Sequence, residues 1–170
     1  MTAVVDAEIT ALLSVLQVQR DHVLGAVEGL SEEALRRPVL PSGWSCLGMV
    51  QHLTLSVERL YFRAVVAGDP EVIDLVSSQD SAWQVTSGLP AADVLDRYRH
   101  EASLADAVIA ASSADADLVW WPFPESEWRL HNLRDVLLHV ITETACHAGH
   151  LDAVRELIDG RQWLVNTKET

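Results

Sequence analysis

One stretch near the C-terminus decides the fold: residues 132–160 read NLRDVLLHVITETACHAGHLDAVRELIDG. Asn132, with Asp135 three residues later, is typical of a helix N-terminus, and Gly160 is typical of a helix end. Val136 and Val154 fall on one face at helical spacing, where an apolar seam would face a core. The stretch therefore predicts one long helix that continues to about Ile158.

Apolar residues recur at steps of three, four and seven in three further stretches, which is the period of a helix and not of a strand. They predict three helices: one over 4–28, one from the capping residue Ser45 to 68–70, and one from Pro90 through Ile109. One capped helical turn is predicted at 31–35. Residues 71–89 predict a loop with one short helical piece. We expect an all-α four-helix bundle in a single domain over 1–170, with connections long enough for crossovers.

Charge excludes several classes of partner. The chain of 170 residues has 25 acidic and 12 Lys or Arg side chains, a net charge of −13. Such a chain would repel nucleic-acid phosphates and anionic lipid head groups, so we expect neither nucleic acid nor a membrane as a partner. There is no apolar run long enough to cross a bilayer and no basic secretory start, and Cys46 and Cys146 are too few for a disulfide framework. We therefore expect a cytoplasmic protein with free thiols.

Five side chains that can bind metals fall within about 100° of one face of the helix over 132–160, if each residue turns the helix by about 100°. They are His139, Glu143, Cys146, His147 and His150. Any single histidine of this group could instead be a structural residue that is hydrogen-bonded to another histidine and to water. The cluster favours a metal site, because side chains at i, i+3 and i, i+4 converge on one point. For Cys146 we favour a small buried apolar residue.

A second helix must complete such a site, and His52 is the best supplier. It lies near the middle of the helix that begins at Ser45, and most residues on its face are small, which leaves room for an ion and a water. Imidazole and carboxylate suit Zn²⁺, Ni²⁺, Fe²⁺ or Mn²⁺, and three protein ligands leave an open position for catalysis. Two Glu-x-x-His motifs are lacking, so we expect one metal ion and not a di-iron centre.

The sequence resembles the DinB/YfiT-like superfamily, metal-binding four-helix proteins that include mycothiol-dependent maleylpyruvate isomerase and bacillithiol transferases. The resemblance lies in residues 48–62, GMVQHLTLSVERLYF, and in residues 138–152, LHVITETACHAGHLD. It is nearest to an actinobacterial branch whose last helix typically reads Glu-Thr-x-x-His-x-Gly-His.

The resemblance implies a divalent metal, zinc by preference, held by His52, Glu143 and His147. Many relatives have His at the position of Glu143 and Gln at the position of His150. It therefore stays open whether His150 is a further ligand, replaces Glu143 as a ligand, or acts from beside the ligands. The resemblance further implies a homodimer and an enzyme that uses mycothiol, a low-molecular-weight thiol, to attack a small electrophile or to isomerise it. A metal-dependent hydrolase and a non-catalytic metal or small-ligand binding protein are the alternatives.

Several residues near the expected site could contact a substrate. Arg59 follows His52 by seven residues on the same helical face, where it could pair with Glu58, Glu143 or a substrate carboxylate. Trp44 precedes one site helix, and a group of aromatic residues precedes the other, so together they could wall a pocket at one end of the bundle. That group is Trp120, Trp121 and Trp128. His22 and His100 show no partner pattern, and we expect structural or surface roles.

Overall fold

A computed structural model describes residues 7–78 and 82–163. Its described residues form helices and one isolated bridge between Asp117 and Asn132, with no strand, which confirms the all-α prediction. The elements in chain order are α1 (Ala7–Val27), α2 (Glu32–Arg36), α3 (Cys46–His52), the π-helix η1 (Leu53–Val66), α4 (Pro70–Ser78), α5 (Ala91–Ala110) and α6 (Leu133–Asp159).

The helices begin and end at the residues that the sequence indicates. The Ser45 hydroxyl accepts a hydrogen bond from the Gly48 N–H at the start of α3, and the Asn132 side chain accepts one from the Asp135 N–H at the start of α6. Gly160 ends α6 with a φ of 77°, a left-handed conformation that glycine adopts without a steric penalty. Helix α5 begins one residue later than expected, because Pro90 is its N-cap and Ala91 is its first residue.

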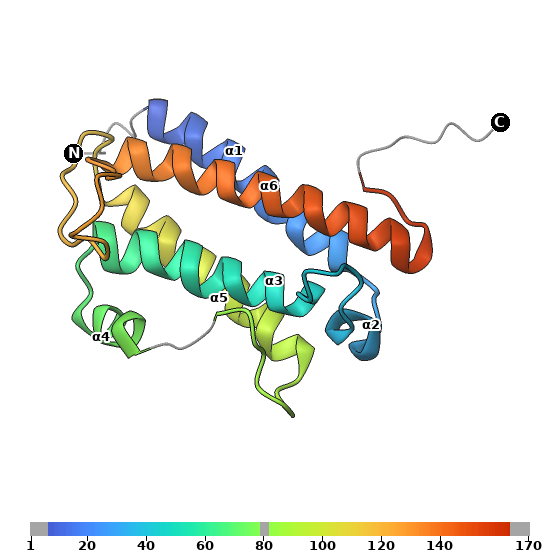
Figure 1. The fold of residues 1–170 in the computed structure, drawn as a ribbon. Helices are drawn as coiled ribbons and strands as arrows, with labels where there is room; N and C mark the ends of the chain where they lie inside the picture. Colours follow the sequence, from blue (N-terminus) through green and yellow to red (C-terminus); the bar gives the residue numbers. More distant parts are fainter. Residues whose placement is uncertain (1–6, 79–81, 164–170) are drawn as a thin grey trace.

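Four long helical segments form the bundle: α1, the continuous pair of α3 and η1, α5 and α6 (Figure 1). Helices α1 and α6 run parallel, because Arg134 near the start of α6 pairs with Glu8, and Asp152 farther along pairs with His22. Helix α5 runs in the same direction as η1, so the chain crosses back along the bundle through α4. The expected crossover is therefore the connection between η1 and α5.

One continuous apolar core joins all four segments, and a buried ion pair crosses it. The Arg20 guanidinium donates two hydrogen bonds of 2.7 Å to the Glu58 carboxylate on η1, and a third of 2.6 Å to Asp106 on α5. Arg20 and Glu58 are each 1% exposed. These contacts fix α1, η1 and α5 relative to one another.

The π-helix changes which residues share a face with His52. A π-helix closes i→i+5 hydrogen bonds and has roughly 4.4 residues per turn, or about 82° per residue, where an α-helix turns by about 100°. At that angle Arg59 rotates to the side of the helix away from His52, whereas Tyr61 comes within about 20° of the His52 direction. Because of the π-helix, Tyr61 and not Arg59 lies on the face toward α6.

None of the helices in the described part of the chain combines the length and apolar character needed to span a membrane.

Candidate metal centre

Three side chains from two helices meet between α3 and α6. His52 at the end of α3 and Glu143 and His147 on α6 each offer one ligand atom, and these atoms all lie within 4.8 Å of one another. The His147 Nε2 atom is 3.5 Å from the Glu143 carboxylate. The structure thus brings together the three residues that the two sequence motifs indicate, in a group that could hold a metal ion.

The environment of His52 suits a metal ligand. Its Nδ1 atom is buried and has no hydrogen-bond partner among the described residues, although a buried polar atom without a partner costs about 1 to 3 kcal/mol. Burial and the neighbouring His147 lower the pKa of His52 to about 4. The imidazole is therefore neutral near pH 7, as a metal ligand must be.

His147 contacts Glu143 through one ring nitrogen and His150 through the other. Its Nδ1 atom lies 3.4 Å from the Nδ1 atom of His150, and the tautomers of the two rings decide which nitrogen donates. Burial lowers the pKa of His147, against the opposing effect of the Glu143 carboxylate. His150 itself is exposed and lies outside the group of His52, Glu143 and His147.

A tryptophan that the sequence analysis did not single out covers His52. The Trp83 ring stacks on the His52 ring with a centroid distance of 4.0 Å and an angle of 10°. The Gln51 side-chain amide holds this segment by donating to the carbonyls of Ala82 and Gln84. Gly48 permits the approach, since a Cβ atom there would lie 2.5 Å from the Trp83 carbonyl oxygen. A tryptophan in a loop carries no periodic signal that would have identified it.

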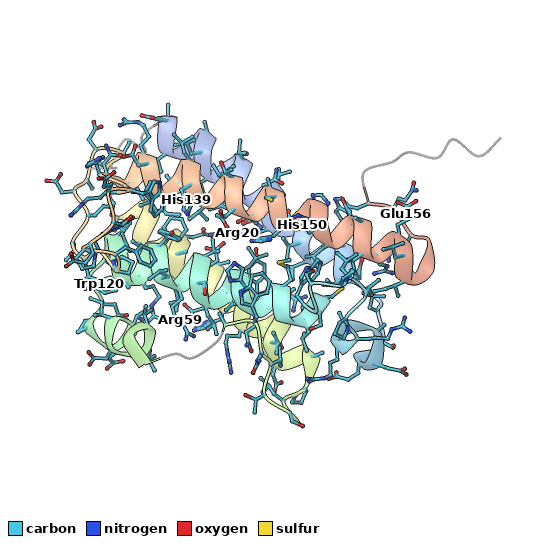
Figure 2. All side chains as sticks on the ribbon, in the orientation of Figure 1. Arg20, Arg59, Trp120, His139, His150 and Glu156 are labelled. Carbon is cyan, nitrogen blue, oxygen red and sulfur yellow. The ribbon has the colours of Figure 1, made fainter. Side chains whose placement is uncertain are left out.

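The tryptophans expected at one end of the bundle lie on two sides of the site instead. Trp44 lies 6.4 Å from His150, measured between ring centroids, whereas Trp128 lies 5.2 Å from His139 and contacts Trp121. Figure 2 shows His139 and His150 at separate positions along α6. The reason is that α3 and α6 run in opposite directions, so the segments that precede them are at opposite ends.

The π-helix gives Arg59 and Tyr61 different surroundings from those that α-helical spacing predicts. Arg59 lies on the side of η1 away from α6 (Figure 2), where its guanidinium donates to the Glu101 carboxylate at 2.6 and 2.9 Å. Tyr61 instead packs against His139 with a centroid distance of 4.7 Å. Burial, together with the Glu143 charge, raises the pKa of Tyr61 to about 12.

The remaining candidates are structural or peripheral. His22 is buried, 2.5 Å from Asp152, and stacks on Trp163, and His100 is exposed on α5, as expected. Cys146 is exposed, so the expectation of a buried apolar residue is wrong, because its position on α6 points outside the packed seam. The other thiol, Cys46, is buried, and burial raises its pKa to about 11.

Residues 11–160 match the profile of the family described as mycothiol-S-transferase. The chain belongs to the mycothiol-S-transferase family. This is a DinB/YfiT-like metal-binding family, so the resemblance seen in the sequence is confirmed. Membership in the mycothiol-S-transferase family implies a transferase enzyme that depends on mycothiol. No curated protein sequence matches the chain significantly.

The donor atoms of His52, Glu143 and His147 fit a divalent cation. Two neutral imidazoles and one carboxylate form a ligand set with one negative charge, and such sets suit Zn²⁺ and other first-row divalent metals. If His52 binds through Nδ1, a cation would also provide the partner that this buried atom lacks. Three ligands leave a position for an exogenous group, which a transferase requires.

Proposed function

We propose that this chain transfers mycothiol to a small electrophile at a divalent metal held by His52, Glu143 and His147. The observation that carries the proposal is the convergence of these three ligand atoms in a member of the mycothiol-S-transferase family. Coordination of a thiol by a dication lowers the thiol pKa and holds the reactive thiolate in place. Among the metals that this donor set suits, Zn²⁺, Ni²⁺, Fe²⁺ and Mn²⁺, we propose zinc.

The protein side chains prepare the site for that chemistry. Burial keeps His52 and His147 neutral, so their nitrogen lone pairs are free to bind. We propose that His150 orients His147 through the contact between their Nδ1 atoms, and that it is not a ligand of the same ion. Trp83 covers one face of His52 and limits the access of water to the ligand.

The substrates would reach the site from its two sides. We propose that Trp44 and Trp121 contact them, because one tryptophan lies beside His150 and the other belongs to the cluster beside His139. Arg59 would have to leave its ion pair with Glu101 before it could bind a substrate carboxylate.

We further propose a cytoplasmic homodimer of one domain, 1–170. Support for a reducing compartment comes from the two unpaired cysteines, Cys46 and Cys146. Support for self-association comes from Val15 and Val18 on α1, apolar side chains that are 47% and 61% exposed. Sedimentation velocity of the wild type and of Val18→Glu tests the dimer, and a wild-type monomer at micromolar concentration would contradict it.

Metal analysis of the purified protein, combined with a transfer assay, tests the proposed activity. We expect about one metal ion per chain in the wild type and in His100→Ala, an exposed histidine outside the site, and little metal in His52→Ala or His147→Ala. The wild type should consume an electrophile only when mycothiol is present. Turnover without thiol would indicate a hydrolase, and stoichiometric metal without either activity would indicate a binding protein. Both results would refute the transferase proposal.

A further inference from the structure

A cluster of aromatic side chains lies beside the candidate metal centre, in the segment that precedes α6. The ring of Trp121 lies 5.3 Å from that of Trp128 and 5.9 Å from that of Phe123, measured between centroids. Trp121 is buried, but Trp128 and Phe123 remain 46% and 44% exposed. We call Trp121, Phe123 and Trp128 the aromatic cluster. Large apolar rings in this state mark a surface that another molecule can cover.

The aromatic cluster connects directly to the site through His139. The His139 ring lies 5.2 Å from Trp128 on one side and 4.7 Å from Tyr61 on the other. His139 precedes Glu143 by one turn of α6, and the Glu143 charge acts on both His139 and Tyr61. Trp128 therefore contacts the residue that lies one turn before Glu143 on α6.

The aromatic cluster also contains a buried donor without a partner. Trp121 is 8% exposed, and its indole N–H has no hydrogen-bond partner among the described residues. A buried N–H in this state favours a ligand with an acceptor group, because such a ligand removes the penalty of the missing hydrogen bond. Electrophilic arenes carry such groups, since nitro and carbonyl substituents are what make the ring electron-poor.

The exposed surface is the right size for a small molecule and too small for a protein. Two half-exposed rings present about 200 Å² together, given 150–250 Å² for a whole aromatic side chain. A stable protein interface buries about 800 Å² on each partner. The surface of one flat ring system matches the smaller value.

We propose that the aromatic cluster binds the electrophilic substrate, and that this substrate is a planar aromatic electrophile with a nitro or carbonyl acceptor. The inference rests on the proposed transfer of mycothiol. For a chloroarene, the mycothiol sulfur would form a C–S bond to the ring carbon that bears chlorine. The C–Cl bond would then break, chloride would leave with its electron pair, and the thiol proton would pass to solvent. Trp128 and Phe123 would stack on the ring, and the Trp121 N–H would bind the acceptor.

Variants of the exposed rings test this site with two electrophiles. With chlorodinitrobenzene and mycothiol, Trp128→Ala and Phe123→Ala should raise the KM for the arene about tenfold and leave the KM for mycothiol and kcat within twofold. With iodoacetamide, which has no ring, both variants should match the wild type within twofold. Trp128→Phe should retain most of the affinity for the arene. Trp163→Ala is the matched control, because Trp163 is 41% exposed but stacks on His22 instead.

Equilibrium dialysis of dinitrotoluene, an unreactive analogue, separates failure of this inference from failure of the proposed function. Metal-free wild type should bind the analogue, and Trp128→Ala and Trp121→Phe should bind it at least threefold more weakly. Equal losses with both electrophiles, unchanged binding in the variants, or a change in sedimentation of Trp128→Ala would overturn the aromatic site. Binding of dinitrotoluene without any mycothiol transfer would refute the transferase function while retaining the aromatic site.

Discussion

The ionisation of His52 depends strongly on the fold. Its pKa of about 4 compares with 6.5 for a free imidazole, since burial disfavours the charged form and His147 adds repulsion. The folded protein therefore binds fewer protons than the unfolded chain between these two values. Stability that is fully present above pH 6.5 must then be lost as the pH falls toward 4.

We predict that metal-free protein loses stability on acidification more steeply than metal-free His52→Gln. The difference in slope should approach, and not exceed, about 1.4 kcal/mol per pH unit, the value for one proton. Urea denaturation in the presence of a chelator at pH 7, 6 and 5 measures it. Parallel curves for the two proteins would show that His52 ionises in the folded state as it does in the unfolded chain.

Local sequence signals predict the ends of the helices well, because capping residues act on their own helix. Ser45, Asn132 and Gly160 all lie at observed boundaries. The convergence of the two candidate ligands on α6 was also predictable, because α6 is a regular helix in which His147 follows Glu143 by one turn. In contrast, Arg59 was expected on the face of His52, because the prediction assumed α-helical spacing where the structure has the π-helix η1.

Helix α3 packs closely against the segment that carries Trp83, so adding a methyl group at Gly48 should weaken metal binding. In Gly48→Ala, the new Cβ atom would clash with the Trp83 carbonyl oxygen and displace the tryptophan from His52. We expect a loss of about tenfold or more in metal affinity, as for other groups that orient a ligand. Gly149→Ala on α6 is the control, because its Cβ atom would meet nothing within 4 Å. Metal titration of both variants measures the effect, and equal affinities would contradict it.

The buried ion pair between α1 and η1 predicts that removing one of its two charges lowers the free energy of unfolding more than removing both. Arg20→Met leaves the Glu58 carboxylate buried without its partner, so we expect a loss of about 3 to 5 kcal/mol in the free energy of unfolding. The double variant Arg20→Met with Glu58→Met should recover much of that loss, because neither charge of this buried pair then remains. Urea denaturation of the single and double variants measures both. A double variant as unstable as the sum of its single variants would show that the two charges act independently.

At the scale of the whole molecule, the candidate metal site joins α3 to α6, although the chain between them passes through α4 and α5. An ion bound there holds together two segments that are distant in sequence, and it binds only the folded chain. It also adds two positive charges to a chain with a net charge of −13. Both effects favour the folded state, so metal binding and thermal stability must be linked.

We therefore predict that Zn²⁺ at one hundred times its dissociation constant stabilises the protein by about 2.7 kcal/mol. For a chain of this length that corresponds to a rise in Tm of roughly 5 to 10 °C. Calorimetry with Zn²⁺ and with chelator measures the rise, and Ni²⁺, Fe²⁺ and Mn²⁺ in the same experiment rank the metals. The Tm of His52→Ala and of Glu143→Gln should change by less than half as much, because each variant removes one ligand from the group. A full rise in both variants would show that the stabilising ion binds elsewhere in the molecule.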